Sequence, residues 1–297
     1  MSIKIPVYGI PVDSVNAGCQ FAPAVLREEG LFKNQLLQDQ GDLSLPVVDP
    51  VRDVKTGIRG FHDFINVSKQ IQKEVTGILS KQKKVILLGG CCSILIGIMA
   101  AFRQLDKKVG LAFLDGHWDY YDGKSSANGE LADMELGILL GQGPKELTML
   151  NTSAPIISEE RIVVLGPRDL EESLQNGARN PRRLHPKLQS YTASQTQQQG
   201  SIETANRSLT VLESLQDGFW IHLDLDILSS EAFSAVDYHQ PGGLNEEELL
   251  SLARPLFHSP KNLGLDLTIY NPNLDPQRVC AQKIIRFLDK LLTSKYA

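Results

Sequence analysis

Short apolar runs alternate along this chain with longer segments in which apolar residues recur at helical spacing. The short runs predict strands at 3–10, 45–48, 84–88, 111–114, 161–165, 219–225 and 263–270. The longer segments predict helices at 22–27, 61–81, 94–102, 134–140, 246–256 and 277–292. Residues 176–201 are polar and rich in glutamine, so we expect an exposed excursion of helix and loop there, without chemistry.

Strands and helices alternate through the whole length, which predicts an α/β fold. Its sheet should be mainly parallel, covered by helices on both faces and connected by right-handed crossovers. A chain of 297 residues could form one large domain or two small ones, and we predict a single domain over 1–297. Functional residues of such a sheet are expected at the carboxyl ends of its strands.

Two of the predicted strands end in alternating acidic residues. The first runs into Asp115, His117 and Asp119, and the second into Asp224 and Asp226. On an extended backbone, residues two apart point the same way, so each set can converge on one point beyond the sheet edge. Carboxylate oxygens with an imidazole suit divalent cations such as Mn, Zn, Ni or Fe(II), and we predict a metal site.

A purely structural role for these aspartates is the alternative to a metal site. Aspartates at strand ends often cap the following helix or hold a turn. Because the same acidic pattern follows two separate strands, the structural explanation is weaker for both together than for either one alone. Four buried carboxylates would also repel one another strongly without a cation.

Composition excludes several other classes. Hydrophobic residues make up 42% and charged residues 22%, as in ordinary globular proteins, and no apolar run is long enough to cross a bilayer. A net charge of −5 argues against nucleic acid or an anionic membrane as the main partner. The N-terminus lacks a secretory signal, so we expect a cytoplasmic location. The four cysteines form no CxxC pair, and we expect reduced thiols.

Several motifs in order resemble the ureohydrolases, the family of arginase, agmatinase and formimidoylglutamase. The motifs are Gly9-Ile10-Pro11, Gly89-Gly90 with Ser93, Asp115-x-His117-x-Asp119, Asp224-x-Asp226 and Pro241-Gly242-Gly243-Leu244. The resemblance implies a three-layer α/β/α sandwich, a small-molecule substrate and a homo-oligomer. It also implies a binuclear metal centre, usually of manganese, with two ions per chain.

The resemblance also implies a ligand set. Asp115 and Asp224 would bridge the two ions, Asp119 would hold one, and His117 with Asp226 the other. Cys92 stands where the family has a histidine ligand, and Cys91 where it has an acid. A thiolate ligand at Cys92 would favour Zn, Fe or Ni. The alternative for Cys92 is a buried thiol that packs like a small apolar residue.

Other departures from the family pattern concern the substrate. Its proton-shuttling histidine corresponds to Ala132 and its guanidinium-binding glutamate to Ile269, which argues against arginase activity itself. Glu130 and Asp133 could supply a replacement acid, or could be solvated loop carboxylates.

Three further residues have predicted roles, two in substrate contact and one in the core. Glu171 and Tyr121 correspond to positions that contact substrate in some relatives, although Glu171 could equally be an exposed glutamate near a helix start. His222 is expected to be a hydrogen-bonded core histidine.

The leading functional hypothesis is metal-dependent hydrolysis of a C–N bond in a guanidino, amidino or related small cationic compound. Asp119 could accept the proton of the attacking water and pass it to the leaving nitrogen. One alternative is a catalytically degenerate relative that acts as a binding or regulatory subunit. Another is a mononuclear-zinc amide deacetylase.

Overall fold

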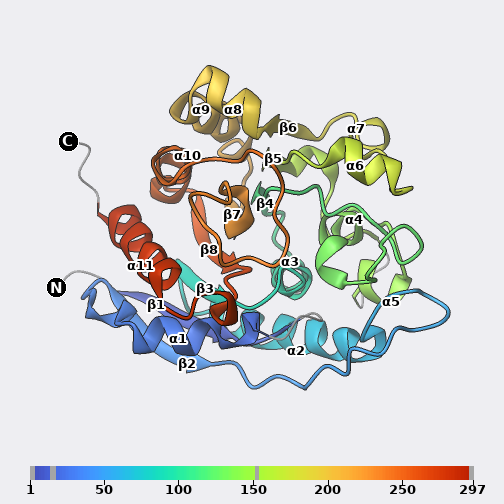
Figure 1. Ribbon diagram of the computed structural model, residues 1–297, viewed down its shortest axis with the longest axis horizontal. Coiled ribbons are helices and arrows are strands. Elements are labelled where there is room, and N and C mark those ends of the chain that lie inside the picture. The colour runs from blue at the N-terminus through green and yellow to red at the C-terminus, as the bar shows by residue number, and fades with distance from the viewer. Residues whose placement is uncertain (1–3, 14–17, 151–153, 294–297) are drawn as a thin grey trace.

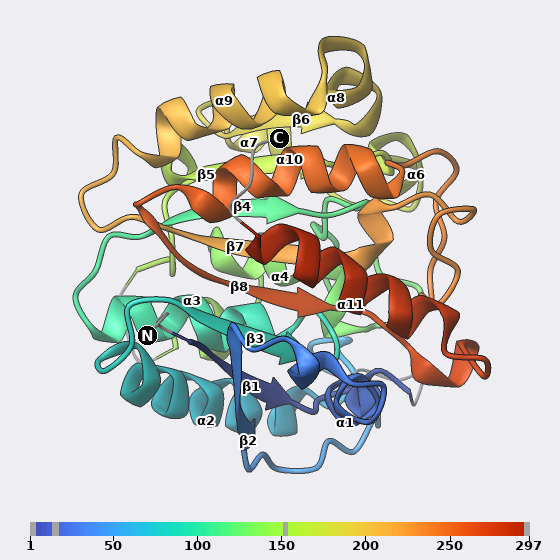
Figure 2. The same ribbon diagram turned by 90° about the vertical axis from the view of Figure 1, so that its left-hand side faces the viewer.

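Residues 4–13, 18–150 and 154–293 are described by a computed structural model of the chain (Figure 1). Among them, eight strands form one sheet in the order β2-β1-β3-β8-β7-β4-β5-β6. The pairs of neighbouring strands are parallel throughout. The arrows of β1, β4 and β8 in Figure 2 point to the same side. The strands are β1 Ile5–Ile10, β2 Leu37–Asp42, β3 Val85–Gly89, β4 Gly110–Leu114, β5 Ile162–Gly166, β6 Gln189–Thr192, β7 Phe219–Asp224 and β8 Asn262–Thr268.

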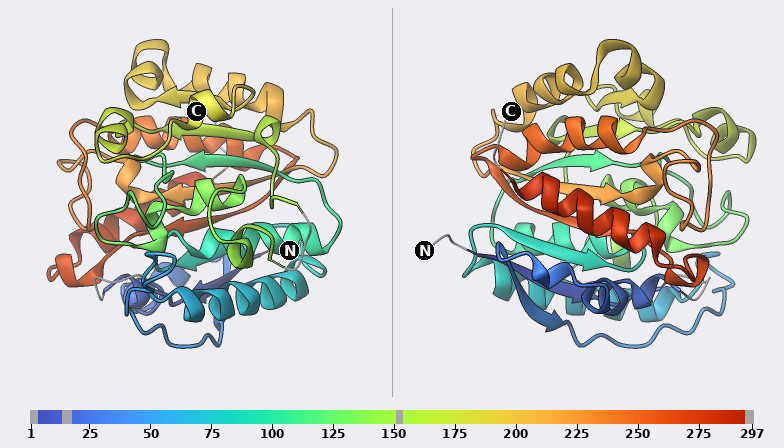
Figure 3. Two further views of the ribbon diagram at one scale, coloured as in Figure 1. Left: turned by 90° about the vertical axis from the view of Figure 1, so that its right-hand side faces the viewer. Right: turned by 60° about the vertical axis from the view of Figure 1, so that its left-hand side comes forward.

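Helices cover both faces of the sheet, which gives the three expected layers. One face packs against α2 Phe61–Leu79, α3 Ile94–Gln104, α4 Glu135–Leu139 and α5 Lys145–Thr148. The other packs against α1 Ala22–Glu28, α8 Ala193–Gln199, α9 Ser201–Leu212, α10 Glu246–His258 and α11 Val279–Leu292. The two views in Figure 3 show these layers from opposite sides. Two further helices, α6 Leu170–Gln175 and α7 Pro181–Leu184, follow β5.

The central strands are apolar because both of their faces are covered. Every residue of β3, β4, β5 and β7 is buried, and their side chains divide between two hydrophobic clusters, one on each face of the sheet. Such strands have continuous apolar runs rather than alternation, which is the pattern that predicted them. The predicted parallel sandwich is confirmed.

Both edge strands differ from the prediction. The strand predicted at 45–48 is wrong, since that segment is irregular and the strand lies at β2, exposed along its length after Leu37. The other edge strand, β6, lies inside the polar excursion 176–201, together with α7 and α8. Edge strands are open to solvent on one side, so their polar sequences carried no strand pattern.

Strand register determines where the acidic residues meet. Leu114 of β4 pairs with Leu223 of β7, so Asp115 and Asp224, one residue further along, lie side by side at the carboxyl edge. Asp224 in turn pairs with Thr268 of β8. The turn after β3 reaches the same edge, where the Gly90 carbonyl accepts a hydrogen bond from the Ile269 amide at 2.8 Å.

Gly90 allows this turn to approach its neighbour closely. A Cβ at Gly90 would lie 1.7 Å from the carbonyl oxygen of Val12, so no larger residue fits. The turn thereby holds Cys92 beside the ends of β7 and β8.

The amphipathic α11 offers a test of the packing. Leu288 is fully buried, whereas Val279 of the same helix is half exposed. We expect Leu288→Ala to lower the free energy of unfolding by about 2–5 kcal/mol, because it leaves a cavity. Val279→Ala should change it by no more than about 0.5 kcal/mol. Urea unfolding of both variants measures this, and equal effects would contradict the packing described.

Candidate metal centre

Backbone amides fix the aspartates at the two strand ends. The His117 amide donates to Asp115 Oδ1 at 2.6 Å, and the Asp226 amide donates to Asp224 Oδ1 at 2.8 Å. The Gly116 amide donates to Asp226 Oδ1 at 3.0 Å, which ties the end of β4 to the turn after β7. Each carboxylate is therefore held by one oxygen, and the other oxygen is available to a neighbour or an ion.

One ligand group, the outer group, consists of Asp115, His117 and Asp226. One ligand atom from each lies within 4.8 Å of the others. His117 Nδ1 is 2.9 Å from Asp226 Oδ2 and 3.6 Å from Asp115 Oδ1. Burial opposes the charged imidazole, but the carboxylates of Asp226 and Asp115 raise the pKa of His117 well above its usual value. The same two carboxylates could hold a metal cation.

A second ligand group, the inner group, consists of Cys92, Asp115, Glu135 and His222. All four are buried, and one ligand atom from each lies within 4.8 Å of the others. The Cys92 thiol donates to Asp224 Oδ2 at 2.6 Å. Sequence reasoning found Cys92 and Asp115 but missed Glu135, although an acid within the apolar segment 134–140 was a signal that could have found it.

His222 is the buried, hydrogen-bonded histidine that the sequence predicted, but it also belongs to the inner group. Its Nδ1 lies 2.5 Å from Asp266 Oδ2, and Asp266 Oδ1 accepts a hydrogen bond from the Trp220 indole at 2.5 Å. Asp266 was also missed by sequence reasoning. Its only signal was a lone acid inside an otherwise apolar buried strand.

Burial and mutual repulsion govern the acids of both groups. Burial, with Asp226 nearby, raises the pKa of Asp115 and of Asp224. Burial also raises the pKa of Asp119 well above its usual value, and that of Glu135 to about 8. The carboxyls of Asp119 and Glu135 face each other. Negative charge at these positions is therefore costly unless a cation is close.

The described lysine and arginine side chains do not pair with the carboxylates of this cluster. The nearby Arg168 donates to the backbone carbonyl of Asp226 at 2.7 Å, not to a carboxylate. Within 4–13, 18–150 and 154–293, no lysine or arginine forms an ion pair with Asp115, Asp224 or Asp226. Buried atoms without a hydrogen-bond donor remain here, namely Asp115 Oδ2 and both carboxylate oxygens of Glu135. Such orphaned acceptors fit a bound divalent metal.

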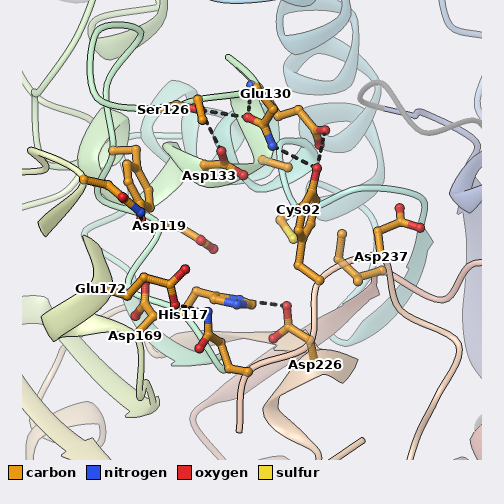
Figure 4. Close-up of a pocket in the computed structure, with 18 residues that line it drawn as sticks. Cys92, His117, Asp119, Ser126, Glu130, Asp133, Asp169, Glu172, Asp226 and Asp237 are labelled. Carbon is orange, nitrogen blue, oxygen red and sulfur yellow. Dashed lines mark hydrogen bonds and ion pairs between the residues drawn. The ribbon is translucent and has the colours of Figure 1, made fainter. Parts of the chain in front are cut away.

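An acidic cavity of about 290 Å³ opens onto these groups (Figure 4). His117, Asp226 and Cys92 lie in its wall, as do Tyr121 and Asn176. The acids that line it are Asp119, Glu130, Asp133, Asp169, Glu172, Asp226 and Asp237. Among the described residues that line it there is no lysine or arginine.

Of the two loop acids, Glu130 is buried and Asp133 is partly buried. Glu130 is 3% exposed and its Oε1 accepts a hydrogen bond from the Tyr238 hydroxyl at 2.9 Å. Asp133 accepts one from the Ser126 hydroxyl at 2.8 Å, yet burial raises its pKa to about 7. Ala132 also lines the cavity.

Glu171 and Asp119, both predicted site residues, lie differently with respect to the cavity. Glu171 is exposed on α6 and does not line the cavity, whereas its neighbour Glu172 does. Successive residues of a helix point in directions about 100° apart, so only one of the two can face the cavity. Asp119 lines the cavity with a backbone φ of 44°, a conformation that few residues other than glycine adopt.

Comparison with known proteins agrees with this geometry. The sequence profile described as "Arginase family" matches residues 3–293. The chain belongs to the arginase family. An arginase of Staphylococcus aureus strain MSSA476 is 29% identical over 276 residues, which cover 90% of this chain and 89% of that protein. The predicted ureohydrolase resemblance is confirmed.

Solved structures share the fold. Arginase from Bacillus subtilis superposes with a TM-score of 0.85 at 24% identity, over 99% of this chain and 100% of that one. Formimidoylglutamase from Bacillus subtilis subsp. subtilis str. 168 has a TM-score of 0.74 at 20% identity, over 98% of this chain and 87% of that one. This protein is thus an arginase-family hydrolase, and the family is metal-dependent. In the part of the chain described, none of the helices combines the length and apolar character that crossing a membrane requires.

The substitution Asp119→Asn tests the effects of charge repulsion and of metal binding on stability separately. Removing one buried acid should leave the metal-free protein as stable as the wild type or more stable, because repulsion falls. The rise in unfolding midpoint on adding Mn²⁺ or Zn²⁺ should shrink. For the wild type, that rise corresponds to about 2.7 kcal/mol when the ion is at 100 times its Kd. Thermal unfolding with and without a chelator measures both effects.

Glu203→Gln is the matched control, because Glu203 lies on α9 and, among the described residues, its ion pair is with the exposed Arg207. Its metal response should equal that of the wild type. If the unfolding midpoint of the wild-type protein does not change on adding Mn²⁺, Zn²⁺, Ni²⁺ or Fe²⁺, the metal centre is contradicted.

Proposed function

We propose that this protein hydrolyses a carbon–nitrogen bond in a guanidino, amidino or related small cationic compound. The observation that carries the proposal is the acidic cavity, free of lysine and arginine among its described lining residues, at the mouth of two candidate ligand groups. Such a cavity attracts cations and repels carboxylates. We therefore expect agmatine, which has no carboxylate, to be a better substrate than arginine.

In this proposal two divalent ions bind per chain. The oxygen and nitrogen atoms of the outer group suit manganese, and the Cys92 thiol makes zinc, nickel or iron candidates for the inner group. Bound metal would supply Lewis-acid activation of water near neutral pH. Asp119, with its carboxyl in the cavity wall, would accept the proton released by the water and pass it to the leaving nitrogen.

The loop acids take over roles that the family gives to other residues. Ala132 cannot transfer a proton, and Ile269 cannot bind a guanidinium group. Glu130 is buried in the same loop and held by Tyr238, so it would serve as the replacement acid. Tyr121 lines the cavity and would contact the substrate. The substrate-binding role of Glu171 stays a prediction that its exposed position does not support.

A catalytically degenerate binding or regulatory subunit is the second candidate. The observation in its favour is that Ala132 and Ile269, without proton-transfer or guanidinium-binding groups, both line the cavity. It predicts that cationic ligands bind without being hydrolysed. A panel of guanidino compounds, agmatine and acylated polyamines, each with Mn, Ni, Fe and Zn, distinguishes the two, since specific turnover excludes this candidate. Amide cleavage with one zinc per chain would instead indicate the deacetylase-like enzyme.

Assembly and location belong to the same proposal. We infer from the family that the chain forms a homo-oligomer, and from its sequence that it folds as one domain in the cytoplasm. Sedimentation of the purified protein tests the first inference, and a monomer at micromolar concentration would contradict it.

Glu130→Gln tests the replacement acid. Losing a proton-transfer group should lower kcat/KM by about 10²–10⁴-fold, with metal content unchanged. Glu171→Gln removes the exposed carboxylate outside the cavity and should have little effect on kcat/KM. Steady-state kinetics with the best substrate of the panel measure both. If Glu171→Gln were the more damaging variant, the assignment of roles to these two acids would be reversed.

A further inference from the structure

The inner group has the features of a metal site whose donors differ from the ligand set that the family resemblance implied. We propose that it binds a zinc ion through Cys92, Asp115, Glu135 and His222, and that this ion is structural, while the chemistry takes place at the outer group. The assignment of chemistry to the outer group rests on the proposed function. The ligand set of the inner ion does not.

Unsatisfied atoms converge on this site. Asp115, Glu135 and His222 are each fully buried, and Cys92 is 3% exposed. Among the buried atoms that have no hydrogen-bond partner are Asp115 Oδ2, His222 Nε2 and both carboxylate oxygens of Glu135. These atoms belong to three residues of one four-residue group whose ligand atoms lie within 4.8 Å of one another. Buried polar atoms are rarely left unpaired, so their convergence points to a cation site.

The orientation of His222 supports a role as a ligand. Asp266 Oδ2 lies 2.5 Å from Nδ1, and Trp220 holds the other oxygen of Asp266 at 2.5 Å. This arrangement directs Nε2 toward the inner group. Histidines that bind metals commonly donate their second ring N–H to a carboxylate in this way.

An ion pair between His222 and Asp115 is the competing explanation, and the two atoms lie within ion-pair range without forming a hydrogen bond. His222 Nε2 and Asp115 Oδ2 are 3.8 Å apart, too far for a hydrogen bond. Two ligands at about 2.0–2.2 Å from one tetrahedral zinc lie roughly 3.3–3.6 Å apart. The gap is therefore close to what an intervening ion requires.

The donor types favour zinc. One thiolate, one imidazole and two carboxylates give four ligands, which is the usual number at a structural zinc site. Manganese prefers oxygen donors and is less suited to a thiolate. The Cys92 thiol donates its hydrogen to Asp224 Oδ2, so metal binding through the thiolate would release that proton.

The two groups also differ in access. Two of the three outer ligands, His117 and Asp226, line the cavity, whereas of the four inner ligands only Cys92 does. A site with four protein ligands is closed, while a catalytic site keeps an open position beside three. The outer group supplies three ligands and faces the cavity, so an ion there would keep a position for water and substrate.

Cobalt substitution of the full-length chain tests this ligand set without any substrate. The protein is stripped with a chelator, loaded with Co²⁺, and examined by absorption spectroscopy and metal analysis. We expect two equivalents per chain and a thiolate-to-cobalt charge-transfer band. Cys92→Ser should abolish the band, and His222→Gln and Glu135→Gln should each reduce binding from two equivalents to one. Cys91→Ser is the control, because Cys91 is buried beside Ser93 and belongs to neither group. This variant should keep the charge-transfer band and bind two equivalents of cobalt.

Two further measurements cover other outcomes. X-ray absorption at the zinc edge of wild-type protein with one equivalent of Zn²⁺ requires no variant to fold. We expect one sulfur ligand at about 2.3 Å, and ligation by oxygen and nitrogen alone would overturn the proposal. His117→Asn should abolish turnover but keep the cobalt–thiolate band.

Full metal binding by His222→Gln and Glu135→Gln would also overturn the proposal. A protein with the expected cobalt spectrum but no turnover on any compound of the panel would keep the inner site and lose the proposed function.

Discussion

Electrostatic repulsion among buried carboxylates is the constraint on which the site depends. Parallel strands β4 and β7 end in register, and their register brings Asp115 and Asp224 side by side. Glu135 and Asp119 add two further acids to the same buried region. Such a cluster persists in a folded protein only when cations or shared protons offset the charge. The orphaned oxygens of Asp115 and Glu135 favour cations.

The fold itself brings these residues together, so few positions in the sequence need to be specified. A parallel sheet places all carboxyl ends on one edge, and the order of strands puts β3, β8, β7 and β4 next to one another. The glycine turn after β3 and the loop 122–133 both reach the cavity at this edge, through Cys92 and Ala132. Substitutions in those segments can alter the site while the sheet is unchanged.

Much of this could be predicted from the sequence, for physical reasons that also explain the failures. Asp115, His117, Asp224 and Asp226 were found from their spacing of two after apolar runs. The extended backbone assumed for them is wrong, since β4 ends at Leu114 and Asp226 lies in a 3-10 helix that the Asp224 side chain caps. Glu135 was not, because one acid in a short apolar helix resembles a solvent-facing position until its surroundings are known. The edge strands β2 and β6 were missed because their exposed residues need not be apolar. Convergence of residues far apart in the chain, such as Glu135 with His222, requires coordinates.

The central claim is that bound cations neutralise the acidic cluster. Anomalous diffraction from crystals of the metal-loaded protein tests it most directly. We expect two anomalous peaks per chain, one among the ligand atoms of the inner group and one among those of the outer group. Crystals soaked in metal that show no peak at either position, with the carboxyls paired through short hydrogen bonds, would contradict the claim.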